Sequence, residues 1–355
     1  MAHINPGLRI AHRGAGSLQI GVGPGGLVVE GLDEREEAFI AMLATGRGAP
    51  DPRQEAARAG IGEARAVELL AALEPVLFPT EAGEGSTGIR SERLRPEERR
   101  LAALHHRPAD TLLGRREHAV VRINGLGRTG AALAQALVAA GVGTMLLQDD
   151  AVVRLADVGP GGYRMADIGM PRSAAVRRAL LSLDPACQPH IVHAGSAASE
   201  DFHLLDLVVH CGHDTVDAAT SAALMRRDQP HLLVLHREQD GTVGPLVLPG
   251  VGACAECVER HRADADPQWL GVCASLAGGE EPGEDAPSAL SLAGAAARAA
   301  LVFLDGVHAP AALSAVLTLR ASDAAWSRTE YTAHPGCGCQ FQRQALAMIS
   351  NTASP

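Results

Sequence analysis

Four of the seven cysteines lie in two close pairs that have the spacing of metal ligands. Cys254 and Cys257 follow a Pro-Gly turn, and Cys337 and Cys339 form a second pair near the C-terminus. Tetrahedral zinc accepts four thiolates, and each pair can supply half of such a set on a tight turn. A closed four-thiolate site leaves no position for a reactive water, so we predict a structural zinc site.

The other cysteines and two histidines give weaker signals. His261 and His334 lie near the paired cysteines and are alternative zinc ligands. Cys187 and Cys211 lie beside expected core strands, where a buried, unreactive thiol is common. Cys273 is the one thiol in an expected loop, so its reactivity is worth a separate test.

A glycine-rich turn is the second cluster that could carry chemistry. Gly125, Gly127 and Gly130 form a Gly-x-Gly-x-x-Gly motif after an apolar strand and at the start of a helix. Such a turn lets phosphate approach backbone N–H groups at a helix N-terminus. Asp149 follows about 20 residues later, where a carboxylate can accept hydrogen bonds from a ribose. The motif predicts a nucleotide site; alternatives are an NAD enzyme and glycines that serve only helix–strand packing.

Composition excludes several classes of partner. All 31 basic residues are arginine, so no lysine ammonium can act as a ligand or nucleophile. The formal net charge of −10 provides no broad basic surface for nucleic acid or an acidic membrane. The apolar run Ala131–Gly143 is too short to span a bilayer, and the N-terminus shows no signal-peptide pattern. We therefore expect a soluble, cytoplasmic protein with no nucleic-acid or membrane partner.

From Ala119 onward, the elements that would position these residues alternate between strands and helices. This alternation predicts an α/β fold with a doubly wound, mainly parallel, Rossmann-like sheet. The acidic, Gly/Pro-rich loop at residues 277–287 would act as a lid or would be only a mobile connecting loop. The expected strands are Ala119–Ile123, Thr144–Gln148, His190–His193, Leu204–His210 and His231–Leu235, and the expected helices are Ala131–Ala140, Ser173–Leu183 and Thr215–Arg226.

A smaller α+β domain is expected before this sheet. Residues 8–29 alternate apolar runs with glycine-rich breaks, as in an antiparallel meander. Asp33 and Glu36 have capping-box spacing, and two further helices are expected at Pro52–Ala59 and Ile61–Leu73. Three strands and three helices fit a winged-helix-like module. The expected organisation is a winged-helix-like domain at 1–80, a linker at 81–118 and the main domain at 119–355.

Together these motifs resemble the ThiF/MoeB superfamily, which has the ubiquitin-activating-enzyme-like fold. The resemblance covers roughly residues 119–345. Cysteine pairs in this order, after a Pro-Gly turn, are more specific than the glycines, because dinucleotide dehydrogenases lack them. The motifs that carry the resemblance are the glycine turn, Asp149, the segments at 167–172 and 206–214, Pro249-Gly250 and the two cysteine pairs.

The resemblance implies an ATP- and magnesium-dependent adenylyltransferase, which commonly dimerises through the sheet domain. The glycine turn and Asp149 would then cradle the nucleotide. Arg172 stands where the family has a lysine, which keeps the charge but changes the hydrogen-bond geometry. Asp157 replaces a phosphate-binding asparagine, and Asp214 could replace the magnesium-handling aspartate by a shift of one residue.

The family's phosphate-binding arginine is also missing. Arg128 or Arg164 could substitute for it, although both could equally be ordinary surface residues. The resemblance assigns no residue a catalytic role.

A small strand–helix module ahead of a ThiF-like domain is similar to the peptide-recognition elements of proteins that modify ribosomally made peptides. In microcin-type adenylating enzymes such a module binds the substrate peptide. In thiazole/oxazole clusters, ThiF-like proteins present a leader peptide to a YcaO partner. A leader would add along an exposed strand edge, at Leu18–Val22 or Leu27–Val29. Our first hypothesis is therefore a leader-binding protein that serves a YcaO-type enzyme, and the alternative is an active adenylyltransferase of a peptide or carrier-protein carboxylate.

Overall fold

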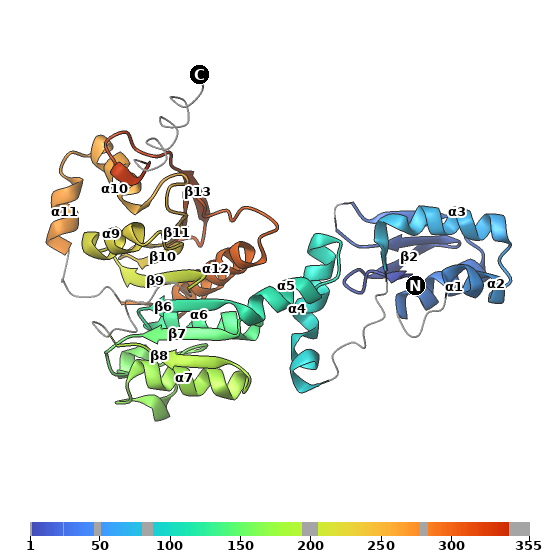
Figure 1. Cartoon of the computed structure of the whole chain (residues 1–355), viewed down its shortest axis with the longest axis horizontal. Helices are drawn as coiled ribbons and strands as arrows, with labels where there is room; N and C mark the ends of the chain where they lie inside the picture. Colours follow the sequence, from blue (N-terminus) through green and yellow to red (C-terminus); the bar gives the residue numbers. More distant parts are fainter. Residues whose placement is uncertain are drawn as a thin grey trace, which may run out of the picture. The chain divides into compact units, whose positions relative to one another are not determined.

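The computed structural model describes residues 2–23, 25–45, 51–79, 88–193, 205–276 and 283–340. The chain divides into two compact units, Met1–Gly114 and Arg115–Pro355, each with its own hydrophobic core. Figure 1 shows both units and labels most of their helices and some of their strands.

The first unit contains a three-stranded antiparallel sheet of order β2-β3-β4 and a separate antiparallel pair, β1 and β5. The predicted capping box at the start of helix α1 is confirmed, since Asp33 and Glu36 each accept a hydrogen bond from the other's backbone N–H. Phe39, Ile40 and Leu43 of α1 are buried in the core of this unit. The elements are β1 (Ala2–Ile4), β2 (Ile10–Gly14), β3 (Ser17–Ile20), β4 (Leu27–Glu30), α1 (Glu34–Thr45), α2 (Pro52–Arg58), α3 (Glu63–Leu73) and β5 (Leu77–Pro79).

The predicted linker range contains helices α4 (Ile89–His105) and α5 (Asp110–His118). Helix α4 packs within the first unit, because Asn5 donates a side-chain hydrogen bond to the carbonyl of Ala102 over 2.9 Å. Gly7 permits this approach, because a Cβ there would collide with the carbonyl oxygen of Arg99. Helix α4 therefore belongs to the first unit, whereas α5 spans the boundary between the two units at Gly114.

The second unit is built on a mixed sheet of eight strands among the described residues (Figure 1). Its order is β13-β12-β11-β10-β9-β6-β7-β8, in which β10, β9, β6, β7 and β8 are parallel and β11, β12 and β13 are antiparallel. The parallel part was predicted and the antiparallel part was not. The strands are β6 (Val120–Asn124), β7 (Thr144–Gln148), β8 (Gln188–Ile191), β9 (Leu207–His213), β10 (His231–His236), β11 (Asp240–Val247), β12 (Ala315–Arg320) and β13 (Trp326–Glu330).

Helices cover both faces of this sheet. Leu207 and Val209 of β9 belong to the core formed with α6 and α12, whereas Val208 packs with Leu224 of α9 in a separate cluster. Because neighbouring residues of a strand point to opposite faces, this alternation shows that β9 is buried on both sides. The helices are α6 (Arg128–Ala139), α7 (Arg172–Leu183), α9 (Ala218–Arg226), α10 (Ala255–Ala265), α11 (Trp269–Leu276) and α12 (Ala286–Asp305).

Helix α12 is long and apolar enough, by composition, to cross a membrane, and no other helix of the described residues meets that criterion. Leu292, Ala296 and Ala300 on its buried face belong to the main core, and α12 packs along α6. In this structure it is a core helix.

The order of the parallel strands creates a crevice. Strands β6 and β9 are neighbours, although β7 and β8 come between them in the chain. Helices on either side of such a point diverge, and ligands of open α/β sheets bind there, at the carboxyl ends of the strands. The glycine turn at Gly125–Gly130 leaves β6 at this end.

A buried histidine in β10 should make the stability of the second unit depend on pH. His231 is fully buried and hydrogen-bonded to the carbonyl of Gln229, and burial lowers the pKa of its imidazole to about 4. As the pH falls below about 6.5, the unfolded chain binds this proton before the folded one does, so stability present above that pH is lost toward pH 4. Replacing His231 with leucine should therefore reduce the stability difference between about pH 7.5 and about pH 5 by about 2 kcal/mol. Urea unfolding of both proteins at both pH values measures this, and equal pH dependence would contradict it.

Candidate functional site

A cavity of about 710 Å³ lies at the carboxyl ends of β6, β7 and β9, and we call it the switch-point cavity. Gly125 and Gly127 line it, and Gly130 lies behind it. Gly125 has a φ of 85°, and a Cβ there would collide with the carbonyl oxygen of Cys211, so only glycine lets the turn pass β9. Glycine at 125 and 130 thus serves packing, whereas Gly127 exposes backbone to the cavity.

Asp149 lies at the end of β7 and holds the glycine turn. One carboxylate oxygen accepts the N–H of Leu126 over 2.7 Å, and the other accepts the N–H of Ala151 over 2.8 Å. Both carboxylate oxygens of Asp149 therefore accept hydrogen bonds from this chain's own backbone, and the residue still lines the cavity.

Arg172, at the start of α7, is buried and forms ion pairs with two carboxylates. It donates to Asp157 over 2.8 and 3.1 Å and contacts Asp149 at 3.4 Å. Burial opposes the charge of Arg172, but Asp157 and Asp149 outweigh it and raise the pKa of the guanidinium. Its charge is already balanced before any phosphate binds.

The charges around the switch-point cavity are nearly balanced. Three arginines and four carboxylates line it among the described residues. Arg128 donates to the backbone carbonyls of Glu284 and Val158, both over 2.9 Å, whereas Arg164 is not among the lining residues. Of the two candidate substitutes, Arg128 therefore lies at the site. The lining charges are Arg128, Arg154, Arg172, Asp149, Asp150, Asp157 and Glu284.

A second cavity of about 1420 Å³, here the large cavity, lies between the ends of β9 and β10 and helices α9, α10 and α11. Asp214 lines this cavity and not the switch-point cavity. It has a left-handed backbone (φ 56°), and its carboxylate lies 3.0 Å from Nδ1 of His213. Residues 210–213 of β9 line both cavities, so this strand end is their shared wall.

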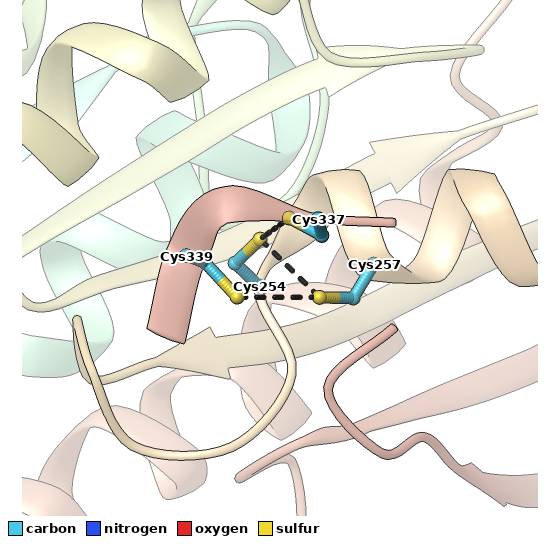
Figure 2. A group of neighbouring side chains, drawn as sticks. All are labelled: Cys254, Cys257, Cys337 and Cys339. Atoms are coloured by element: carbon cyan, nitrogen blue, oxygen red, sulfur yellow. Dashed lines mark hydrogen bonds between the residues drawn. The ribbon is translucent and has the colours of Figure 1, made fainter. Parts of the chain in front are cut away.

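The four paired cysteines converge on one point (Figure 2). Cys254 and Cys257 lie at the start of α10, and their sulfurs are 3.7 Å apart. The sulfurs of Cys254 and Cys337 are 3.6 Å apart, and those of Cys257 and Cys339 are 3.4 Å apart. Sulfurs bound at about 2.3 Å to a tetrahedral zinc lie about 3.8 Å from one another, so this cluster has the size of a zinc site.

The environment favours the thiolate at Cys257 alone among the four cysteines, because the hydrogen bond to Cys257 raises the pKa of Cys254 and burial raises the pKa values of Cys337 and Cys339. Hydrogen bonds from Cys254 and from the backbone N–H of His334 lower the pKa of Cys257 to about 4. His334 accepts the N–H of Gly336 at Nδ1, so its Nε2 carries the proton that it shares with Asp264 over 2.9 Å. His261, Asp264 and His334 form a group of possible metal ligands that is separate from the four cysteines.

The other thiols are shielded. Burial raises the pKa of Cys211, and Cys187 is buried as predicted. Cys273 is partly buried in α11, not in a loop, and burial together with nearby Glu259 raises the pKa of its thiol. Cys211 and Cys273 therefore favour the neutral thiol form.

The sequence profile of the ThiF family matches residues 105–339, about two thirds of the chain. The chain belongs to the ThiF family. Protein HesA from Nostoc sp. strain PCC 7120 is 26% identical over 172 residues, which are 46% of this chain and 67% of that protein. The heterocyst protein HesA of Trichormus variabilis is 25% identical over 171 residues, which are 46% of this chain and 63% of that protein.

Solved structures share the fold of this ThiF-family chain over nearly its whole length. MccB of E. coli with AMPCPP and MccA matches with a TM-score of 0.71 at 18% identity, covering 96% of this chain and 99% of that one. PaaA matches with a TM-score of 0.70 at 17% identity, covering 92% and 99%. At these identities the likeness shows the fold alone.

Sequence reasoning missed three residues of the site in this ThiF-family protein. Thr129, in the first turn of α6, hydrogen-bonds to His236 at the end of β10 and to Glu284 just before α12. Thr129 lies inside the glycine motif, and Glu284 lies in the acidic loop at residues 277–287 that was a candidate lid. No pattern in the sequence, however, indicates that residues more than 100 positions apart would meet. Most of the expected lid lies outside the described residues.

Proposed function

We propose that this protein binds the leader of a ribosomally made precursor peptide through its first unit and presents it to a modifying partner such as a YcaO cyclodehydratase. The observation that carries the proposal is a free strand edge in the small sheet. Strand β4 pairs with β3 on one side, and no strand among the described residues pairs with its other side. An extended peptide can add to such an edge through backbone hydrogen bonds.

The structure corrects one of the two predicted edges. Leu18 and Ile20 belong to β3, which is paired with β2 and with β4 and therefore has no free edge. Leu27–Val29, in β4, is at the edge. The apolar pattern that suggested both segments does not distinguish a central strand from an outer one.

The other edge of the sheet, β2, is less suited to a peptide. Its register with β3 shifts between His12 and Gly14, leaving Arg13 without a partner. His12, Arg13 and Gly14 are also exposed. Bulges and charges of this kind disfavour the addition of another strand, whereas β4 pairs in continuous register.

Helix α3 provides side chains beside the end of β4. Arg65 donates to the carbonyl of Gly31, directly after β4, over 3.2 Å, and pairs with Glu36 at 2.8 Å. This contact places the guanidinium of Arg65 beside the end of β4. MccB, which shares the fold, has been solved in complex with N-formylated MccA, and this supports a peptide partner here.

Strand addition predicts a pattern in the peptide's own backbone. Alternate residues of the peptide would hydrogen-bond to β4, so N-methylation should weaken binding about tenfold at every second position and little in between. Isothermal titration with N-methylated versions of the precursor peptides encoded beside the gene measures this. A uniform or absent effect would rule out edge pairing.

Proline variants provide the matched control for this prediction. The N–H groups of Leu27 and Val28 point to opposite sides of β4, so one of the two single proline substitutions removes an outward donor and leaves the β3 pairing intact. That variant should fold normally by circular dichroism and lose peptide affinity. Arg13→Pro, in the bulge of the opposite edge, should bind as the parent does.

A second candidate function is ATP-dependent adenylation of a peptide or carrier-protein carboxylate. The shared wall at residues 210–213 favours it, because a carboxylate in the large cavity would approach a nucleotide in the switch-point cavity. Pyrophosphate exchange with ATP and magnesium, with and without peptide, tests it. Exchange abolished by Asp149→Ala would establish adenylation, and absence of exchange with every peptide that binds would leave only the first function.

We also propose that the four cysteines hold a structural zinc. The closed set leaves no position for a substrate, and the second pair is 80 or more residues beyond the first, so the metal would tie the C-terminal segment to α10. Metal analysis should give about one zinc per chain. Cys337→Ser should lose most of it and lower the melting temperature, whereas Cys273→Ser should keep both unchanged. Zinc-free protein with an unchanged melting temperature would contradict the proposal.

A further inference from the structure

Helix α6 begins in the switch-point cavity with backbone N–H groups that its own sequence does not satisfy. Its N-cap residue is Gly127, which has no side chain to accept them. The first N–H groups of any helix lack partners within the helix and carry a partial positive charge, so this end attracts an anion. In nucleotide-binding folds that anion is a phosphate.

In this structure the anion is a carboxylate of the chain itself. Oε2 of Glu284 accepts the backbone N–H of Thr129 over 2.8 Å and its hydroxyl over 2.8 Å. The other oxygen, Oε1, lies so close over the turn that a Cβ on Gly127 would collide with it. Glu284 therefore caps α6 from 155 residues away and covers the backbone that a phosphate would contact.

The hydrogen bonds behind Thr129 favour an anion at this position. The hydroxyl of Thr129 has one proton, and it donates that proton in a hydrogen bond to the carboxylate of Glu284. Nε2 of His236 lies 2.6 Å from the same hydroxyl oxygen and must then be the donor. The resulting chain, from His236 through Thr129 to Glu284, directs protons toward the bound anion.

Glu284 is held in place by the elements around it. It directly precedes Asp285, the N-cap of α12, whose side chain accepts the N–H of Ser288. Helix α12 packs along α6, and Arg128 donates to the carbonyl of Glu284 over 2.9 Å. The carboxylate thus comes from the fixed start of a core helix.

We propose that Glu284 is an autoinhibitory residue that occupies the phosphate position of the switch-point cavity and excludes nucleoside polyphosphates until it is displaced. The inference concerns this cavity alone and does not depend on leader binding by the first unit. Displacing Glu284 exchanges one anion for another at the same donors. If Glu284 stayed in place, a polyphosphate would be repelled by four carboxylates, those of Glu284, Asp149, Asp150 and Asp157.

Titration of ATP with magnesium into purified full-length protein tests the proposal. Glu284→Gln and Glu284→Ala should bind ATP roughly tenfold or more tightly than the parent, because a charged competitor has been removed. Adenosine, which has no phosphate, should bind all three proteins equally. Asp285→Asn is the matched control, since it removes a neighbouring charge, keeps a residue that can cap α12, and should leave ATP affinity unchanged.

Several outcomes would overturn the proposal. These are unchanged or weaker ATP affinity in both Glu284 variants, no ATP binding by any of the proteins, an equal gain for adenosine, and an equal gain in Asp285→Asn. Circular dichroism confirms that the variants fold. Peptide affinity measured on the same proteins reports separately on the proposed leader function, so the failure of one idea is distinguishable from the failure of the other.

Discussion

The start of helix α6 is the point on which the site depends. The strand order of the sheet directs it into the crevice between β6 and β9, and its glycine N-cap leaves backbone donors facing that crevice. Those donors need an anion, because unsatisfied N–H groups at a partly buried helix end are unfavourable. If a phosphate accepts these N–H groups, the site can bind a nucleotide. If Glu284 accepts them, as in this structure, the site only links α12 to α6.

The charges around this point explain why the absence of lysine matters. The resemblance to the family motif leads us to expect a lysine at the position of Arg172, and here the planar guanidinium of Arg172 pairs with Asp157 and contacts Asp149. Removing one partner of a buried ion pair destabilises the folded protein. Arg172 therefore has a structural role in this ion pair. Arg128 donates to two carbonyls and forms no ion pair with a carboxylate of the described residues, so its charge could pair with a phosphate.

The parts of the fold that could be predicted are those specified by local patterns. The strand–helix alternation predicted the parallel strands, and the two close spacings predicted that the cysteines would meet. The antiparallel strands β11 to β13 were missed, and for β11 the reason is that it forms a hairpin with β10 without a helical interval. Leu18 was placed at an edge because period and composition do not encode a strand's neighbours. Glu284 was missed because its partner Thr129 is 155 residues away.

The two proposed sites would recognise their partners by different physics. An edge strand binds a peptide through backbone groups that survive most side-chain substitutions. A nucleotide site depends on a few charges, so a single carboxylate such as Glu284 can close it without disturbing the sheet. Because α12 and α6 pack along their length, the capping carboxylate also stabilises the core. Glu284 therefore both covers the start of α6 and strengthens the contact between α6 and α12.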